Sequence, residues 1–149
     1  MNFEFTIDED EFLQALRNIE ITDEDLMHVA GAGSAVIKTH QKLKCPVDLG
    51  ALRASIAEEF KKGDAIASIE IGPSMDYAPY VEFGTGEFAL NGRGRKGGWV
   101  YKGRHGFRFT LGNRPQPFIV PSAFGESLTQ TIKSIEVAFA MLVQSKWKK

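Results

Sequence analysis

The sequence is poor in several features that would point to a particular class of protein. Among its 149 residues there is a single cysteine, Cys45, so no disulfide can form within one chain. A lone thiol is typical of a protein made in a reducing compartment. No apolar run approaches the roughly 20 residues needed to cross a bilayer, and the acidic N-terminus lacks the basic and then apolar layout of a signal peptide. We therefore expect a cytoplasmically made protein that does not enter a membrane.

Residues for metal binding or nucleophilic catalysis are also scarce. The three histidines, His28, His40 and His105, have no partner at a metal-ligand spacing, and there is no second cysteine. The glycines at 84–86 and 92–94 match neither a phosphate-binding loop nor a dinucleotide fingerprint. We therefore expect no catalytic residue, no cofactor and no metal ion. A small hydrolase using Cys45 or a histidine is the alternative, and it would need a pocket of convergent polar groups.

Acidic residues are missing from one long stretch. Between Phe88 and Gly125 there is no Asp or Glu, whereas residues 1–25 hold nine acidic residues against Arg17 alone. The acid-free stretch contains seven basic residues: Arg93, Arg95, Lys96, Lys102, Arg104, Arg108 and Arg114. Segregated charge of this kind favours contact between copies of a chain or contact with a polyanion. Because Trp99, Tyr101, Phe107 and Phe109 lie among the basic residues, a nucleic-acid-binding hairpin at 93–114 is a second hypothesis.

The apolar periodicity of the first half predicts helices and short strands. Alternation at 2–7 predicts a strand, and Asp8 with Glu11 predicts the start of a short helix. A longer helix is expected from Thr22 or Asp23 to Pro46, with Gly31 and Gly33 either allowing close packing or marking a bend. Two strands are expected at 55–60 and 65–71, joined by a turn at 62–64 and ended by Gly72-Pro73.

The second half predicts an insertion followed by a long helix. Residues 77–83 form either a helical turn or a strand, 84–98 a mobile glycine-rich loop, and 99–109 a hairpin that projects from the body. The C-terminal helix is expected to open at Pro121 or Ser122 and to bury one apolar stripe. That stripe consists of Phe124, Leu128, Ile132, Ile135, Phe139 and Leu142.

Together these patterns predict an α+β fold, in which a small antiparallel β-sheet packs against two long α-helices, one N-terminal and one C-terminal. We expect residues 1–149 to form a single domain, with a long basic loop or hairpin insertion at 84–113 that is flexible.

Three short blocks combine turn-forming residues with apolar anchors. In the first, at 45–56, Asp48-Leu49-Gly50 predicts a turn in which Asp48 bonds to its own backbone, and Arg53 is expected to pair with an acidic residue of 8–11 in an adjacent copy. In the second, at 77–85, the aromatic residues are predicted to be core. The alternative is that Tyr80 and Glu82 lie at the edge of an interface. In the third, at 114–121, prolines stiffen an extended segment that seats Phe118.

In this order the blocks resemble the tail-completion, or head–tail joining, proteins of long-tailed bacteriophages, and the resemblance covers residues 20–135. The matching residues are Pro46, Asp48, Gly50, Leu52, Arg53, Ser55 and Ile56, then Tyr77, Ala78, Tyr80, Val81, Glu82, Phe83, Gly84 and Thr85, then Pro115, Pro117, Phe118 and Pro121. Leu49 stands where the family usually has threonine, and the stretch at 94–101 is similar to an insertion found in a subset of the family.

The resemblance implies a non-enzymatic, structural virion protein made in the cytoplasm of a bacterial host. It implies a ring, expected to be a hexamer and to form either alone or on the particle, between the head connector and the tail tube, with DNA passing through its centre. The partners implied are other copies of the chain, head connector or stopper proteins, tail terminator or tail tube proteins, and transient non-specific contact with double-stranded DNA. The blocks are candidate inter-subunit contacts, and the basic residues of 93–114 are expected to line the DNA channel or to reach onto the tail.

Overall fold

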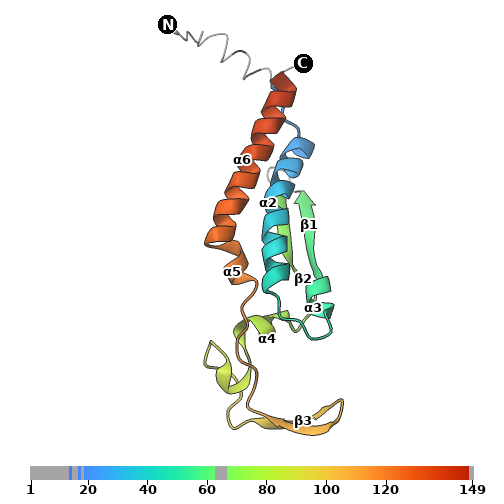
Figure 1. Cartoon of the computed structure of the whole chain (residues 1–149), viewed down its shortest axis with the longest axis vertical. Helices are drawn as coiled ribbons and strands as arrows, with labels where there is room; N and C mark the ends of the chain where they lie inside the picture. The colour runs from blue at the N-terminus through green and yellow to red at the C-terminus, as the bar shows by residue number, and fades with distance from the viewer. Residues whose placement is uncertain (1–13, 15–16, 18, 63–66, 148–149) are drawn as a thin grey trace.

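A computed structural model describes residues 14, 17, 19–62 and 67–147 of the chain. The strand expected at 2–7 and the helix expected to open at Asp8 lie outside the described residues, apart from two helical positions at Gln14 and Arg17. The described chain is elongated, with two long helices and a sheet toward one end, and short helices and a hairpin toward the other (Figure 1).

Helix α2 (Asp23–Lys44) begins and ends where the sequence predicts. Thr22 caps it, because the Thr22 hydroxyl accepts a hydrogen bond from Asp25 N at 3.2 Å and the Asp25 carboxylate accepts one from Thr22 N at 2.9 Å. This reciprocal arrangement satisfies two backbone N–H groups that a helix start leaves free. The last helical residue is followed by Cys45, whose extended backbone is the conformation favoured before a proline.

Gly33 lets α2 approach a second long helix, α6 (Glu126–Trp147), very closely. A Cβ atom built on Gly33 would lie 2.8 Å from Cγ1 and Cδ1 of Ile135 and 3.2 Å from Cγ2 of Thr131. Helix α2 continues through this position without interruption. The sequence left two roles open for Gly31 and Gly33, which were close packing or a bend. The role of Gly33 is therefore close packing.

Strands β1 (Ile56–Lys62) and β2 (Ala67–Pro73) form an antiparallel pair whose register runs from Ile56 opposite Pro73 to Lys62 opposite Ala67. Gly72 and Pro73 were expected to break the second strand, but both belong to β2. Pro73 is tolerated because it ends a strand of a two-stranded sheet, where a missing N–H interrupts little of the ladder. The predicted turn falls largely on 63–66, outside the described residues.

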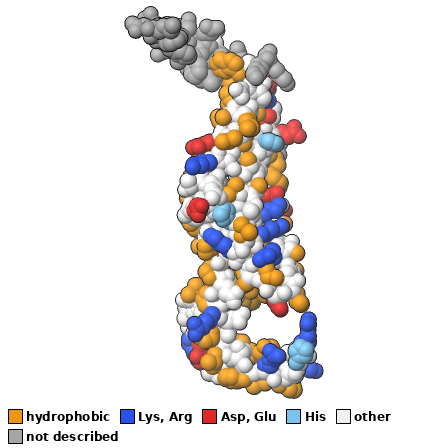
Figure 2. All heavy atoms as spheres, viewed as in Figure 1, with side chains coloured by type: hydrophobic (Ala, Val, Ile, Leu, Met, Phe, Trp, Pro, Cys, Tyr) orange, Lys and Arg blue, Asp and Glu red, His pale blue; other side chains and the backbone are white. Residues whose placement is uncertain are grey.

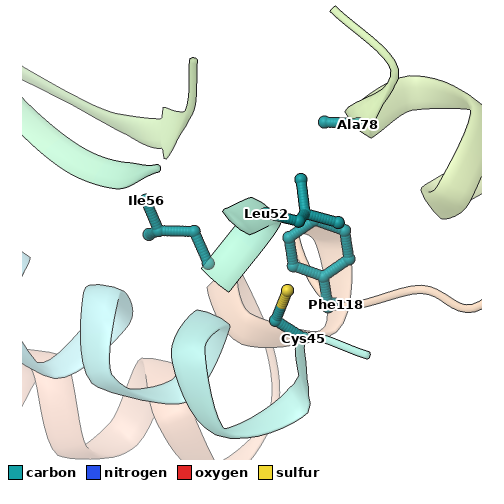
Figure 3. Packing of buried hydrophobic residues seen from close by; sticks show 5 residues of the cluster. All are labelled: Cys45, Leu52, Ile56, Ala78 and Phe118. Atoms are coloured by element: carbon teal, nitrogen blue, oxygen red, sulfur yellow. The ribbon is translucent and has the colours of Figure 1, made fainter. Parts of the chain in front are cut away.

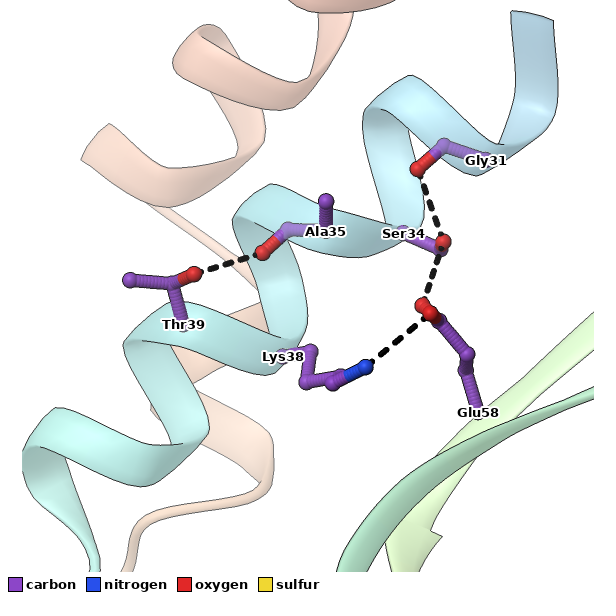
Figure 4. Close-up of polar contacts among 6 residues, drawn as sticks. All are labelled: Gly31, Ser34, Ala35, Lys38, Thr39 and Glu58. Carbon is purple, nitrogen blue, oxygen red and sulfur yellow. Dashed lines mark hydrogen bonds and ion pairs between the residues drawn. The ribbon is translucent and has the colours of Figure 1, made fainter. Parts of the chain in front are cut away.

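The sheet packs on α2 partly through a polar clamp (Figure 4). The Lys38 ammonium lies 3.0 Å from Glu58 Oε1, and the Ser34 hydroxyl lies 2.8 Å from Glu58 Oε2. The same hydroxyl lies 2.9 Å from Gly31 O, so its one proton can go to either acceptor. The hydrogen bonds from Lys38 and then Ser34 lower the pKa of Glu58. The body therefore has three layers, in which α2 lies between the β1–β2 sheet and α6.

The C-terminal helix differs from its prediction in two ways. It is divided into a short helix, α5 (Val120–Ala123), and α6, with a break where Gly125 has φ +68°. The face that α6 turns to α2 carries small residues, with Ser127 and Thr131 buried and Ser134 and Ala138 half-buried.

The predicted apolar stripe of α6 instead lies at the edge of this seam. Leu128, Ile132, Ile135 and Phe139 keep 43%, 48%, 37% and 42% of their surface exposed. The physical reason is the closeness of the two helices, since large side chains do not fit between backbones that approach through glycine, serine and alanine.

The opposite end of the molecule holds helices α3 (Ala51–Ala54), α4 (Ala78–Phe83) and η1 (Gly86–Phe88) and the hairpin β3 (Trp99–Gly103) and β4 (Gly106–Thr110). Residues 78–83 are thus helical, with Pro79 in the first turn, where its missing N–H is harmless. The hairpin forms a separate two-stranded sheet and projects from the body as predicted (Figure 1). The predicted α+β fold, with one long N-terminal and one long C-terminal helix, is confirmed.

Candidate functional site

The three sequence blocks meet in one small hydrophobic core (Figure 3). Cys45, Leu52 and Ile56 come from the first block, Ala78 from the second and Phe118 from the third. Phe118 is completely buried, at 0% exposure. Residues that are up to 73 positions apart in sequence therefore fix the junction between α2, α3, α4 and the segment that enters α5.

Glu82 joins the second block to the third. Its carboxylate is buried, at 1% exposure, and accepts hydrogen bonds from the backbone N–H groups of Phe118 at 2.7 Å, Ile119 at 2.9 Å and Val120 at 2.9 Å. These amides precede or open α5, so the carboxylate satisfies donors that the helix start leaves free. The alternative in which Glu82 edges an interface is therefore wrong, because its side chain is buried and bonded within the fold.

The turn predicted in the first block is present, but the hydrogen bond predicted for Asp48 within it is not. Gly50 has φ +82°, a left-handed conformation that glycine adopts without strain, and it precedes α3. Asp48 is exposed and makes no hydrogen bond in the described structure, contrary to expectation. Arg53 donates to the Cys45 carbonyl at 3.2 Å and so closes the loop. The loop leaves Val47 and Leu49 exposed by 53% and 74%.

The aromatic residues of the second block lie on the surface. Tyr77, Tyr80 and Phe83 are 44%, 61% and 50% exposed, so the prediction that they form core is wrong. The reason is the length of α4, which is six residues and buries one side only, through Ala78 and Glu82. The outward tyrosines leave the alternative, an interface edge, open for Tyr80.

Two adjoining hollows lie between α4, the hairpin and the loop of the first block. One, of about 310 Å³, is lined by aromatic residues of both elements, including Tyr77, Tyr80, Trp99 and Tyr101. The other, of about 440 Å³, is lined by residues 46–52 and shares Tyr77, Val81 and Asn113 with the first. Figure 2 shows an opening between the helical body and the hairpin on this side of the molecule.

The glycine-rich segment after α4 follows a defined path. Thr85 N donates to Asn113 O at 2.9 Å, and Asn113 N donates to Thr85 Oγ1 at 2.8 Å. Gly86 and Gly112 are needed because a Cβ on Gly86 would overlap the carbonyl oxygen of Leu111, and a Cβ on Gly112 would overlap that of Thr85. The two ends of the 84–113 insertion are therefore paired at its base. Its predicted flexibility stays a prediction.

The third block carries an extended segment into the core. The Gln116 N–H, between Pro115 and Pro117, donates to Val81 O at 2.8 Å and holds this segment against α4. Pro121 occupies the first turn of α5, where its ring suits the helix start.

All seven basic residues of 93–114 are exposed. Two stack on aromatic rings, with the Arg95 guanidinium 5.8 Å from the centre of the Trp99 ring and that of Arg114 5.3 Å from the centre of the Phe88 ring. In the described part of the chain none of the seven forms an ion pair. Their charge is therefore not compensated by ion pairs with any residue that the structure describes.

The residues considered for catalysis are not arranged for it. Cys45 is 2% exposed, and burial raises the pKa of its thiol, which disfavours the reactive thiolate. His40 Nε2 lies 2.8 Å from the Gln130 side-chain oxygen and not from a nucleophile. Within the described ranges, no three His, Cys, Asp or Glu side chains are grouped so that they could hold a metal ion.

The family comparison bears on the first two blocks. The HK97-gp10-like family, described as "Bacteriophage HK97-gp10, putative tail-component", matches residues 10–84, which is half of the chain. The chain belongs to this family. It is a bacteriophage tail component and hence part of the virion, in a family of structural proteins that are generally non-enzymatic. The resemblance seen in the sequence is confirmed at this level.

The matched region ends at Gly84, so the hairpin and the third block lie beyond it. Searches of curated proteins and of solved structures gave no match. Among the described residues, no helix combines the length and the apolar character needed to span a membrane.

Proposed function

We propose that copies of this tail component assemble into a ring, a hexamer, that joins the head connector to the tail tube and surrounds the DNA channel. The observation that carries the proposal is the apolar surface of the single chain. Among the described residues, six hydrophobic side chains are buried, whereas 24 large hydrophobic side chains are exposed. Large apolar patches on a soluble protein mark surfaces that partners cover.

Helix α6 contributes most to this surface. The stripe of Leu128, Ile132, Ile135 and Phe139 follows one flank of the helix. On another flank, Val137, Met141 and Trp147 help to line a third hollow. An apolar helix at the outside of an elongated subunit suits contact with a different surface of the next copy, and repeated contacts of that kind close into rings.

Within the sequence blocks, the exposed residues are the proposed inter-subunit contacts. Val47, Leu49 and Tyr80 present apolar area, and Arg53 presents a charge beside them. The buried residues of the blocks, above all Glu82 and Phe118, hold that surface in place. The basic residues of 93–114 would face the DNA channel or the tail, and contacts to phosphates in a channel must stay weak enough for DNA to slide.

The test is the mass of the full-length protein in solution, alone and after mixing with tail tubes or with connector-bearing heads of the same phage. We expect a hexamer, or a monomer that forms rings only on the particle. Ile132→Lys should prevent ring formation, because it places a charge in the apolar stripe, whereas Thr129→Lys on the exposed part of the same helix should not. A wild-type monomer that binds neither structure would overturn the proposal.

The uncompensated basic charge favours a second candidate, a nucleic-acid-binding protein that uses residues 93–114. This candidate predicts that the isolated protein binds DNA with an affinity whose logarithm falls linearly with the logarithm of salt concentration. The ring proposal predicts little or no binding by the monomer. A gel-shift titration at several salt concentrations distinguishes the two.

A further inference from the structure

The hairpin is an incomplete sheet. Strands β3 and β4 pair with each other only, and in the described chain the outer edge of β3 has no backbone partner. A two-stranded ribbon is marginally stable in water, and an unpaired edge is a template for another strand. The hairpin stands away from the helical body (Figure 1), so this edge is accessible.

The two faces of the ribbon offer different surroundings to the side chains of an added strand. From the register, Trp99 and Tyr101 share one face with Arg108, and this face lines the aromatic hollow against α4. Val100, Phe107 and Phe109 share the other face and are 62%, 78% and 63% exposed. A strand at the β3 edge would therefore place alternate side chains in the hollow and against this apolar face. Edge pairing together with such alternating pockets is how sheets recognise extended peptides.

The charge around the ribbon indicates an acidic occupant. Lys102 lies on the apolar face, Arg108 on the face of the hollow and Arg104 at the tip, and no acidic residue occurs from 88 to 125. Hairpins of neighbouring copies would bring like charges together, which opposes pairing between them. Double-stranded DNA would satisfy the basic residues, but its bases are already stacked on one another, so it would leave the exposed valine and phenylalanines uncovered.

The acidic segment of this chain is also poorly placed to be the occupant. Its described acidic residues, among them Asp23 and Asp25, lie at the start of α2, at the far end of the molecule from the hairpin (Figure 1). Helix α2, with 22 residues, alone spans about 33 Å. A neighbour standing in parallel in a ring would have its own Asp23 and Asp25 at that same far end.

We infer that the outer edge of β3 binds an extended segment of another virion protein, in which apolar residues alternate with acidic ones. This inference rests on the proposed function, because it assigns the hairpin to the contact with the next component of the particle. The apolar residues of the segment enter the aromatic hollow or cover Phe109, and its acidic residues lie beside Lys102, Arg104 and Arg108.

The experiment measures co-sedimentation of the full-length protein with tail tubes, and separately with connector-bearing heads, of the same phage. Tyr101→Ser changes the hollow, Phe109→Ser changes the opposite face, and Leu43→Ser is the matched control, because Leu43 is 72% exposed on α2. We expect each hairpin variant to bind one of the two structures about thirtyfold more weakly, as for an aromatic interface anchor. The control should bind like wild type, and all variants should still form rings.

Hydrogen exchange on the wild-type protein checks the edge pairing without a substitution. In the complex, backbone amides of β3 should exchange about tenfold more slowly if they gain backbone partners. If the hairpin variants bind like wild type, or if β3 exchange is unchanged in the complex, the inference is wrong while the ring proposal stands. If wild type binds neither structure, both are wrong. If the variants lose only DNA binding, the hairpin is a nucleic-acid site instead.

Discussion

The two ends of this molecule are held together in different ways. In the helical body, α2 and α6 meet through small side chains, and polar pairs such as Lys38–Glu58 and Asp25–Lys146 add support at the surface. At the junction with the hairpin end, Phe118 is fully buried and Glu82 holds three backbone amides. The junction is thus specified by a few buried contacts, and the body by a long seam with much apolar surface left uncovered.

The difference separates residues that fix shape from residues that are available for assembly. At the junction, buried groups of all three blocks position an exposed loop and a pair of tyrosines. In the body, α6 carries its large apolar side chains at the rim of the seam, where another protein can cover them. Substitutions should therefore act on stability at the junction and in the seam, and on association at the rim.

The largest expected effect is the loss of the Glu82 carboxylate. Glu82→Ala should lower the free energy of unfolding by about 3 to 5 kcal/mol, because it leaves three amides unpaired at a buried site. Glu82→Gln should lower the free energy of unfolding by less, since its one remaining oxygen still accepts hydrogen bonds. Urea denaturation of the purified monomer measures both.

A matched control for Glu82 is Glu87→Ala. Glu87 is exposed, and its carboxylate accepts a bond from Gly97 N at 3.2 Å. Its removal should cost less than about 1 kcal/mol. Equal destabilisation by the two alanine variants would show that the junction does not depend on the buried carboxylate.

A second prediction compares two glycines of α2. Gly31→Ala adds a Cβ that lies 3.9 Å from the Phe60 ring, an ordinary contact, whereas Gly33→Ala adds one that overlaps Ile135. Both variants gain about 1 kcal/mol of helix propensity, so the difference between them isolates the seam. We expect Gly33→Ala to be less stable than Gly31→Ala by about 1 to 3 kcal/mol.

Thermal unfolding of the two variants measures this difference. Ile135→Val should relieve part of the defect of Gly33→Ala and none of that of an unrelated variant, because Cδ1 of Ile135 is one of the overlapping atoms. If the two glycine variants have the same melting temperature, α6 packs on α2 less tightly than the geometry indicates.

The same comparison shows how much the sequence could predict. Helix caps, helix-ending prolines and apolar periodicity predicted α2, the β1–β2 pair and the hairpin correctly. These elements are set by local signals in the sequence, such as those at Thr22, Pro46 and Trp99. The face of α6 was predicted wrongly because periodicity shows where apolar residues lie but not whether a partner within the chain covers them. The alternative signal, small residues at 127, 131, 134 and 138 opposite Gly33, has helical spacing but low hydrophobicity.

The candidate site was predictable as three blocks but not as one core. Nothing local shows that Glu82 reaches amides 36 to 38 residues away, since a carboxylate among tyrosines also suits an interface. The exposure of Tyr77 and Tyr80 follows from the short α4 and from the burial of Ala78 and Glu82, which are tertiary facts.

A smaller effect is expected from acid, at the end of the body farthest from the hairpin. The Lys146 ammonium lies 2.7 Å from Asp25, and its hydrogen bond, with those of Thr22, lowers the pKa of Asp25 to about 2. Because this pKa is below the unfolded value of 3.8, the pair stabilises the fold above pH 4 or so and ceases to do so as the pH falls through about 2. Asp25→Asn should therefore lower the melting temperature slightly at pH 5, and the gap from wild type should close at pH 2. If the difference in melting temperature between Asp25→Asn and wild type is the same at pH 5 and pH 2, this ion pair is not its cause.

The smallest effect on folding is expected from removing the whole insertion. Thr85 and Asn113 are already joined by two hydrogen bonds, so an Asn-Gly turn can replace residues 86–112 without moving α4 or the third block. The melting temperature should stay within about 4 °C of wild type, which corresponds to about 1 kcal/mol or less for a domain of this size. Rings should still form on the particle if α6 carries the contact between copies. Loss of folding would place the insertion in the core of the domain. Retained folding with loss of attachment to one structure would sharpen the contrast between the two ends, because it would assign self-assembly to the helical body and attachment to the hairpin.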